Sequence, residues 1–289
     1  MVEPIRLAAI TDEFSPDLDV ALDAMLSVGM SGVELRTIGG RNIIDLDNDE
    51  IDGVCDKVAT RGMAILSIAS PLLKCVFPGG PQLDARFQQD AFASRHTFDD
   101  QARLTDRAFE ITDRTGAGII RVFSYWRTVN PSALFDPVVL ALRRLAESAP
   151  AGVTIGLENE HACNVGTGEE LGTMMAAVDH PALGAIWDPA NALVAGEVPY
   201  PAGYGRLTPR RVIHVHAKDC HVDKHVPTWG PVGAMSVDWV GQIAALQQDG
   251  YAGWISLETH WTGPAGDKRE ASLICSRNLQ ALVGSQPRP

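Results

Sequence analysis

Short apolar runs alternate along this chain with longer amphipathic stretches. Runs of four to eight apolar and β-branched residues are typical of strands, whereas apolar residues spaced three and four apart are typical of helices. Strands are expected over 5–10, 32–36, 63–69, 119–123, 153–158, 183–188, 211–217 and 254–258. Helices are expected from Asp17 to Gly29 and over 49–61, 85–115 (as one long helix or two), 132–148, 169–178, 237–248 and 269–282, with loops over 77–82 and 198–205.

This alternation predicts a single closed (β/α)₈ TIM barrel, one domain spanning residues 1–289. The eight strand–helix steps follow one another with no linker or low-complexity break. The length of 289 residues suits the fold, which typically needs about 250. The alternative is an open doubly wound sheet. No G-x-G-x-x-G follows the first strand, which counts against the dinucleotide-binding form of that alternative.

Composition narrows the possible partners. The chain is 45% hydrophobic and carries a formal net charge of −12, so it can bury a core and would repel phosphate backbones. It has no apolar run of membrane-spanning length, and its N-terminus does not resemble a signal peptide. Its five cysteines form no C-x-x-C pair, which is typical of reduced thiols. We therefore expect a cytoplasmic protein that acts on a small molecule, without nucleic acid or membrane. Assembly into a homo-oligomer stays open.

The last four strands each end in a polar residue of matching phase. Side chains alternate inward and outward along a barrel strand, and active-site groups lie at the carboxyl ends of the strands. With the apolar positions facing the helices, four inward residues are expected at the top of these strands: Glu158, Asp188, His216 and Glu258. In the seventh strand Ile213 and Val215 are expected outward, and His214 and His216 inward, with His216 higher.

Three carboxylates crowded at one barrel mouth would repel one another unless a cation lies between them. Each residue alone has an ordinary interpretation, as a solvated carboxylate or a core histidine. The coincidence of four in phase favours one divalent metal, and three carboxylates with one imidazole suit Mn²⁺, Zn²⁺, Mg²⁺ or Co²⁺.

The same segments carry a family resemblance. The motifs are L-E-N at 157–159, W-D-P-A-N at 187–191, H-V-H-A-K-D at 214–219 and S-L-E-T-H at 256–260, with T-D-E-F-S, G-V-E-L-R, S-P-L-L-K, P-V-G-A-M-S-V-D-W and G-Y-A-G-W elsewhere. Together they resemble the xylose-isomerase-like TIM-barrel superfamily of sugar (phosphate) isomerases and epimerases, over nearly the whole chain. The resemblance is specific for the superfamily and the metal site, and weak for the substrate.

The resemblance implies that Glu158, Asp188, His216 and Glu258 hold the metal. It also implies that Glu158 and Glu258 act as acid and base on a carbon next to a carbonyl, and that Lys218 contacts a substrate oxygen. Many relatives read Asp-x-x-His after the sixth strand, where this chain has Asn191. Asparagine can bind a substrate hydroxyl, but it cannot serve as an acid or a base.

Further candidates lie near the strand ends. His260 shares the phase of Glu258 and is a candidate substrate contact, while Arg36 and Glu34 on the second strand and Lys74 after the third could bind a hydroxyl, carboxylate or phosphate, or form salt bridges. Glu160 and His161 could touch substrate, but are expected at the surface. Trp126, Trp229 and Trp261 fall in loops, where they could stack on a sugar or pack in the core. No glycine-rich phosphate cradle is evident.

The expected function is a metal-dependent isomerase or epimerase of a sugar or sugar-like polyol. A dehydratase of the keto-inositol or dehydroshikimate type begins with the same proton abstraction and stays open. An apurinic-site endonuclease would need a metal cluster, for which the Asp223–His225 pair is only a hint. The acidic chain, Asn191 and the absence of histidine from strands two and three argue against it. A non-catalytic sugar-binding barrel is the remaining alternative.

Overall fold

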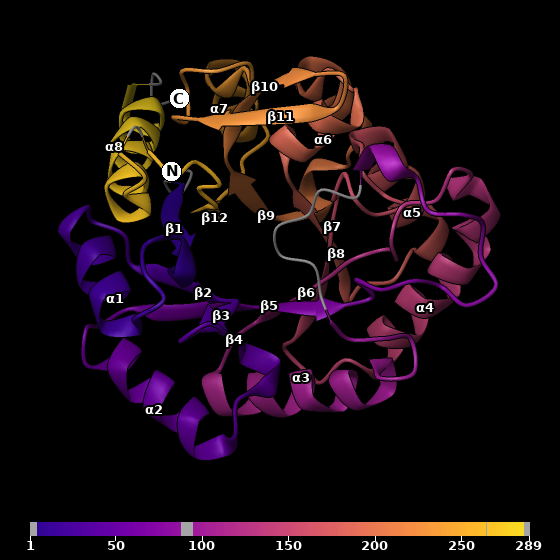
Figure 1. Ribbon diagram of the computed structural model, residues 1–289, viewed down its shortest axis with the longest axis horizontal. Coiled ribbons are helices and arrows are strands. Elements are labelled where there is room, and N and C mark those ends of the chain that lie inside the picture. The colour runs from indigo at the N-terminus through magenta and orange to yellow at the C-terminus, as the bar shows by residue number, and fades with distance from the viewer. Residues whose placement is uncertain (1–4, 88–94, 264, 286–289) are drawn as a thin grey trace.

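The computed structural model describes residues 5–87, 95–263 and 265–285. Eight parallel strands close into a barrel in the order β1-β12-β9-β8-β7-β6-β5-β2, with the helices arranged around it (Figure 1). The barrel strands are β1 Arg6–Ile10, β2 Gly32–Leu35, β5 Ala64–Leu72, β6 Ile119–Val122, β7 Thr154–Glu158, β8 Leu183–Trp187, β9 Val212–Ala217 and β12 Trp254–Leu257. The expected (β/α)₈ barrel is confirmed, and the open sheet is excluded.

The helices of the described chain are α1 Leu18–Ser27, α2 Asn48–Ala59, α3 Gln101–Thr115, α4 Phe135–Ser148, α5 Gly168–Val178, α6 Pro189–Ala195, α7 Trp239–Gln248 and α8 Lys268–Ser285. Short helical turns cover Thr11–Glu13, Ile43–Asp45, Ala85–Phe87, Pro131–Leu134, Pro199–Gly203, Tyr204–Arg206 and Pro209–Arg211. Asp47 and Thr167 begin α2 and α5 with capping boxes, in which the side chains of Glu50 and Glu170 bond back to the cap. None of the helices described is both long and apolar enough to cross a membrane.

The long helix expected over 85–115 is wrong as a continuous element. Helical turns are present at Ala85–Phe87, residues 88–94 lie outside the described part of the chain, and α3 begins only at Gln101. The carboxylate of Asp100 accepts hydrogen bonds from the backbone N–H and the hydroxyl of Thr97, both at 2.8 Å. This side-chain turn competes with helical hydrogen bonding and sets the start of α3.

Two hairpins and one short helix were not expected from the sequence. β3 (Thr37–Ile38) pairs with β4 (Arg41–Asn42) after β2, and β10 (Asp219–Asp223) pairs with β11 (Val226–Gly230) after β9. The β10–β11 hairpin lies beside α6 and α7 (Figure 1). Helix α6 follows β8 directly, and the segment 198–205, expected as a loop, contains helical turns. These additions all follow the carboxyl ends of barrel strands, where the site lies.

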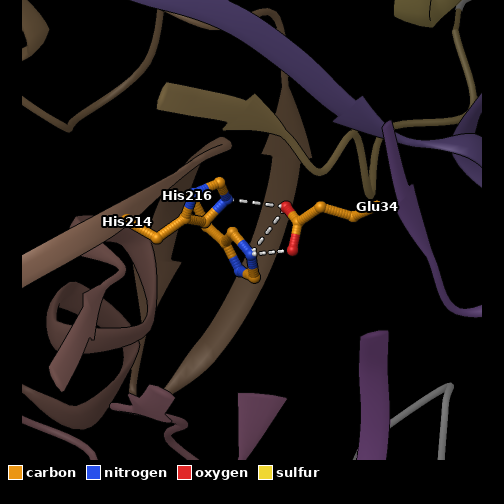
Figure 2. Close-up of side chains that lie close together, drawn as sticks. All are labelled: Glu34, His214 and His216. Carbon is orange, nitrogen blue, oxygen red and sulfur yellow. Dashed lines mark hydrogen bonds and ion pairs between the residues drawn. The ribbon is translucent and has the colours of Figure 1, made fainter. Parts of the chain in front are cut away.

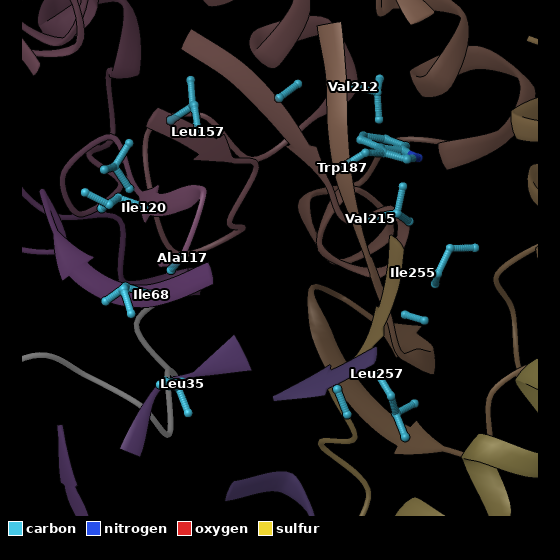
Figure 3. Close-up of a cluster of buried hydrophobic side chains, with 14 of the residues drawn as sticks. Leu35, Ile68, Ala117, Ile120, Leu157, Trp187, Val212, Val215, Ile255 and Leu257 are labelled. Atoms are coloured by element: carbon cyan, nitrogen blue, oxygen red, sulfur yellow. The ribbon is translucent and has the colours of Figure 1, made fainter. Parts of the chain in front are cut away.

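The hydrophobic core is a layer between the strands and the helices. Leu157, Trp187, Val215 and Leu257 belong to this layer, as the alternation in the sequence predicts (Figure 3). Ile213 was expected to face outward, but its side chain lies against Gly184 on the inner side of the barrel. Val212 belongs to the hydrophobic layer instead. The register between β8 and β9 shifts between Ala185 and Ile186, so that Ile186 pairs with His214. A β-bulge of this kind adds a residue and resets the phase, and both histidines above it keep their inward direction.

Glycine in the barrel strands makes room for larger neighbours. A Cβ atom at Gly156 would lie 2.7 Å from Cδ1 of Ile186 and 3.1 Å from Cγ2 of Ile119. A Cβ atom at Gly184 would lie 2.6 Å from Cγ2 of Ile213. The interior below the site is therefore close-packed, which gives the residues above it a rigid base.

Candidate metal and active site

The four polar residues expected at the strand ends come together in one buried cluster. Glu158 is the last residue of β7, Asp188 follows β8 as the N-cap of α6, His216 lies in β9, and Glu258 follows β12. One ligand atom from each lies within 4.8 Å of the others, and all four residues are buried. We call this set the quartet.

Backbone interactions fix the quartet in place. Asp188 accepts a hydrogen bond from the backbone N–H of Asn191 at 2.8 Å, which begins α6. The side chain of Asn159 donates to the carbonyl of Asp188 and accepts from its N–H, both at 2.8 Å. The N–H of Glu258 donates to the carbonyl of Ala217 at 3.0 Å, which continues the strand ladder into the site. The carboxylates are thus attached to rigid elements.

The Lys218 ammonium lies among the carboxylates of the quartet. Its Nζ atom is 2.8 Å from Oδ2 of Asp188 and forms an ion pair with Oε2 of Glu258. Burial by itself would lower the pKa of Lys218, but the charges of Asp188 and Glu258 outweigh it and raise that pKa well above its ordinary value. The ammonium is therefore a fixed positive charge beside the quartet. The family resemblance implies that this residue contacts a substrate oxygen.

His216 presents its two ring nitrogens to different carboxylates. Nδ1 is 3.0 Å from Oε1 of Glu158 and 3.7 Å from Oε2 of Glu258, while Nε2 is 3.2 Å from Oε1 of Glu34. Burial would lower the pKa of His216, but the charges of Glu158 and Glu34 outweigh it and raise the pKa well above the ordinary value. The distances show that the Nδ1 side of the ring faces the quartet and the Nε2 side faces Glu34.

Two arginines balance the glutamates of the quartet. Arg36 donates from Nη1 to Glu258 at 2.8 Å and from Nη2 to Asp12 at 2.8 Å, and it also bonds to Glu13. Arg36 therefore forms salt bridges, which is one of the roles expected for it. Arg121 brings Nη1 to 3.3 Å from Oε2 of Glu158. Arg121 was missed in the sequence, although a single charged residue within the run I-I-R-V signals an inward position.

The expectation that Glu160 and His161 are surface residues is wrong. Each is only 7% exposed, because the segment after β7 folds back into the barrel mouth. Nδ1 of His161 lies 2.8 Å from Oε1 of Glu160 and 2.9 Å from Oδ1 of Asn191. Asn191 in turn donates to the carbonyl of Asn159 at 3.0 Å and lies 3.4 Å from Oε1 of Glu158. An imidazole therefore stands next to Asn191, supplied by the segment after β7.

Lys74 and His260 lie at the edges of the same region. Lys74 is buried, with Nζ 3.4 Å from Oε2 of Glu160 and 4.5 Å from the ring centroid of Phe123. Nε2 of His260 is 3.5 Å from Oε1 of Glu258, and its ring packs edge-on against Trp229 with centroids 4.6 Å apart.

The three loop tryptophans differ in their surroundings. Trp126 lies below the Lys74 ammonium, with Nζ 5.6 Å from its ring centroid. Trp229 and Trp261 are partly buried and pack against the hydrophobic core. Both rings therefore take part in packing, and the Trp229 ring centroid also lies 5.9 Å from Nζ of Lys218.

The Asp223–His225 pair lies apart from the quartet. His225 packs against Phe87 with ring centroids 4.8 Å apart, and its Nδ1 bonds to the carbonyl of Val194 at 2.9 Å. Asp223 is in the β10–β11 hairpin. Among the residues described, the candidate metal-binding groups contain neither of them. The hint of a metal cluster is thus not supported by geometry.

The quartet fits a divalent cation on its own chemistry. Oε2 of Glu158 and Oδ2 of Asp188 are buried and accept no hydrogen bond of good geometry, although Arg121 and Lys218 are close. Buried carboxylate oxygens are costly unless paired or bound to a metal. Three carboxylates and one imidazole form the mixed oxygen and nitrogen set that Mn²⁺ and Zn²⁺ accept.

Comparison with known proteins agrees with this architecture. The sequence matches a family described as xylose isomerase-like TIM barrel over residues 22–279. The chain belongs to this family. The resemblance seen in the motifs is therefore confirmed. No curated protein matches the sequence.

Three solved structures illustrate the range of proteins with a similar fold. A xylose isomerase-like TIM barrel/4-hydroxyphenylpyruvate dioxygenase fusion protein is 24% identical with a TM-score of 0.70, and the match covers 96% of this chain but only 43% of that one. The IOLI protein with a bound zinc atom is 16% identical with a TM-score of 0.75, covering 97% and 99% of the two chains. D-psicose 3-epimerase from Clostridium cellulolyticum H10, solved with D-tagatose, is 15% identical with a TM-score of 0.67, covering 97% and 98%. At these identities the likeness concerns the fold.

Proposed function

We propose that this chain is a divalent-metal-dependent enzyme that isomerises or epimerises a sugar or sugar-like polyol. The observation that carries the proposal is the buried quartet, whose ligand atoms lie within 4.8 Å of one another at the carboxyl ends of the strands. Membership of the xylose isomerase-like family supports the same reaction class. Two of the four residues are glutamates on separate strands, which the chemistry needs as proton carriers.

Glu158, Asp188, His216 and Glu258 would hold one Mn²⁺, Zn²⁺, Mg²⁺ or Co²⁺ ion. When bound, such an ion polarises the carbonyl and neighbouring hydroxyl of the substrate, which makes the proton on the carbon beside the carbonyl more acidic. Lys218 and Asn191 stand next to the quartet with N–H groups that can donate to substrate oxygens. These donors would orient the substrate without changing its charge.

The two glutamates would divide the proton transfer between them. β7 and β12 are separated in the barrel by β8 and β9, so Glu158 and Glu258 approach the quartet from opposite sides. One carboxylate takes the proton from the carbon beside the carbonyl. In an epimerisation the other glutamic acid returns a proton to the opposite face, and in an isomerisation a proton is returned to the neighbouring carbon. Arg36 and Arg121 would keep the two carboxylates in place.

A metal and exchange assay tests the proposal. The full chain, purified without chelator, is analysed for metal, reconstituted with Mn²⁺, Co²⁺ or Zn²⁺, and incubated with ketoses and inososes in D₂O. The true substrate should gain deuterium beside its carbonyl at the rate of turnover, and Glu158→Gln and Glu258→Gln should each lower that rate by about 10²–10⁴-fold. Glu147→Gln, on the exposed side of α4, is the matched control and should be unchanged.

The products separate the remaining alternatives. A product that has lost water would assign the chain to the dehydratases, which begin with the same proton abstraction. Turnover with full retention of the substrate proton would exclude the proposed mechanism. A chain that binds none of these ions would contradict the proposal altogether.

A further inference from the structure

Glu34 lies below the quartet and joins both inward histidines of β9. Its Oε1 atom is 2.8 Å from Nε2 of His214 and 3.2 Å from Nε2 of His216, and all three side chains are fully buried (Figure 2). Glu34 comes from β2, whereas the histidines come from β9. The cluster therefore ties together two strands that are separated in the barrel by β1 and β12.

The carboxylate of Glu34 is held by groups other than His216. The hydroxyl of Ser67 donates to its Oε2 atom at 2.5 Å, and His214 bonds to its Oε1 atom. The ring of His214 stands at 88° to the ring of His216, with centroids 5.4 Å apart. Nδ1 of His214 has no hydrogen-bond partner among the described residues. Among the described residues, Glu34 is therefore the hydrogen-bond partner of the His214 ring.

An ionised carboxylate can only accept hydrogen bonds. A histidine that binds a metal does so as the neutral imidazole, with its one remaining proton on the nitrogen that does not bind the ion. Because Nε2 of His216 is directed to the Glu34 carboxylate, the proton would stay on Nε2 when a metal binds, and the Nδ1 lone pair would face the ion. That Nδ1 atom is the one that lies 3.0 Å from Oε1 of Glu158, on the side of the quartet. Ligand histidines commonly owe their tautomer and ring orientation to such a partner behind them.

We propose that Glu34 is the positioning residue of this site, which holds His216 with Nδ1 facing the metal. The inference rests on the proposed function, because it assigns the nitrogen through which His216 would bind the ion. It also gives His214 a role, which is to fix Glu34 from the side away from the quartet. Substitution of Glu34 should therefore weaken metal binding without removing a ligand.

Glu34→Gln provides the test, because it keeps the size of the side chain and replaces one acceptor oxygen by an N–H₂ donor. Zinc affinity of the full chain is measured by chelator competition, and we expect a loss of about 10–100-fold. Ser67→Ala is the matched control. It removes a bond to the same carboxylate but leaves the contact with His216, and should change the affinity less than threefold. Glu34→Asp keeps an acceptor-only carboxylate and should retain more affinity than Glu34→Gln.

The tautomer is read directly by ¹H–¹⁵N NMR of the histidine side chains in the zinc-loaded chain. In the wild type, His216 should carry its proton on Nε2 and bind zinc through Nδ1, and Glu34→Gln should disturb this pattern. A wild-type chain that binds neither zinc nor Mn²⁺, Co²⁺ or Mg²⁺ overturns the proposed function together with the inference. Wild-type binding that Glu34→Gln leaves unchanged overturns the inference alone. If Glu34→Gln does not fold, zinc found on Nε2 of His216 in the wild type overturns it.

Discussion

The Nζ atom of Lys218 lies 2.8 Å from Oδ2 of Asp188, and neither side chain is exposed beyond 2%. The same ammonium also pairs with Glu258. A buried ion pair gains little net stability over an apolar replacement, but removal of one partner leaves an uncompensated buried charge. Lys218 therefore stabilises a group of carboxylates that would otherwise repel one another.

Replacement of Lys218 by methionine should make folding depend on metal. In the metal-free protein, Lys218→Met should lower the free energy of unfolding by about 3–5 kcal/mol, because Asp188 and Glu258 lose their buried cation. Added Mn²⁺ or Zn²⁺ should raise the melting temperature of the variant more than that of the wild type, which is measured by thermal denaturation with and without metal. Lys57→Met, which breaks an exposed pair with Asp19, is the control and should leave the stability almost unchanged. Equal metal-induced shifts in Lys218→Met and wild type would contradict the argument.

The two inward histidines of β9 should behave differently when removed. His216→Ala should abolish tight metal binding and activity while the barrel stays folded, because the fold depends on the strand ladder and the core. His214→Ala should lower the free energy of unfolding by about 1–3 kcal/mol, since it removes a buried ring and one bond to Glu34, and should retain part of the metal affinity. Melting temperature and metal content of both variants decide the matter. Loss of metal in His214→Ala with retention in His216→Ala would exchange their roles.

The quartet could be predicted because strand alternation has a period of two and barrel sites lie at strand ends. Glu158 and Glu258 needed only the phase of their own strands. The inward direction of His214 and His216 was predicted correctly even though the β-bulge turned Ile213 inward. A bulge depends on pairing with the neighbouring strand, which a single sequence does not reveal.

The surroundings of the quartet depend on contacts between distant segments, and these were less predictable. Glu34 was identified only as a candidate on the second strand and Arg121 was missed, because the partners of these residues come from other strands, β9 and β7. The burial of Glu160 and His161 depends on how the segment after β7 folds against α6. Loop geometry of this kind is set by hydrogen bonds rather than by hydrophobic periodicity, so the sequence pattern carries little information about it.

The cysteines should be unreactive in the folded protein. None of the five forms a disulfide, and burial raises the pKa of Cys75 and of Cys220 to about 12, so the thiolates of these two residues are scarce at neutral pH. At pH 8 a disulfide reagent should modify all five thiols quickly only after denaturant is added, with half-buried Cys55 as the first to react in the native state. Because the folded pKa is raised, the thiols do not affect stability below pH 9. Stability should fall as the pH rises from about 9 towards 12, where unfolded thiols ionise first. Rapid native labelling of Cys75 or Cys220 at pH 8 would contradict the burial.

Two glycines in contrasting surroundings test the packing of the barrel interior. Gly156 faces Ile186, where a Cβ atom would approach to 2.7 Å, so Gly156→Ala should lower the free energy of unfolding by about 1–3 kcal/mol. Gly53 lies within α2, where a Cβ atom would meet nothing within 4 Å. Gly53→Ala should therefore raise the free energy of unfolding by about 0.5–1 kcal/mol, because alanine loses less backbone freedom in a helix. Denaturant titration of both variants measures the difference. If Gly156→Ala were as stable as the wild type, Ile186 would have to move without cost, and the interior beneath the quartet would not be the rigid base that the structure indicates.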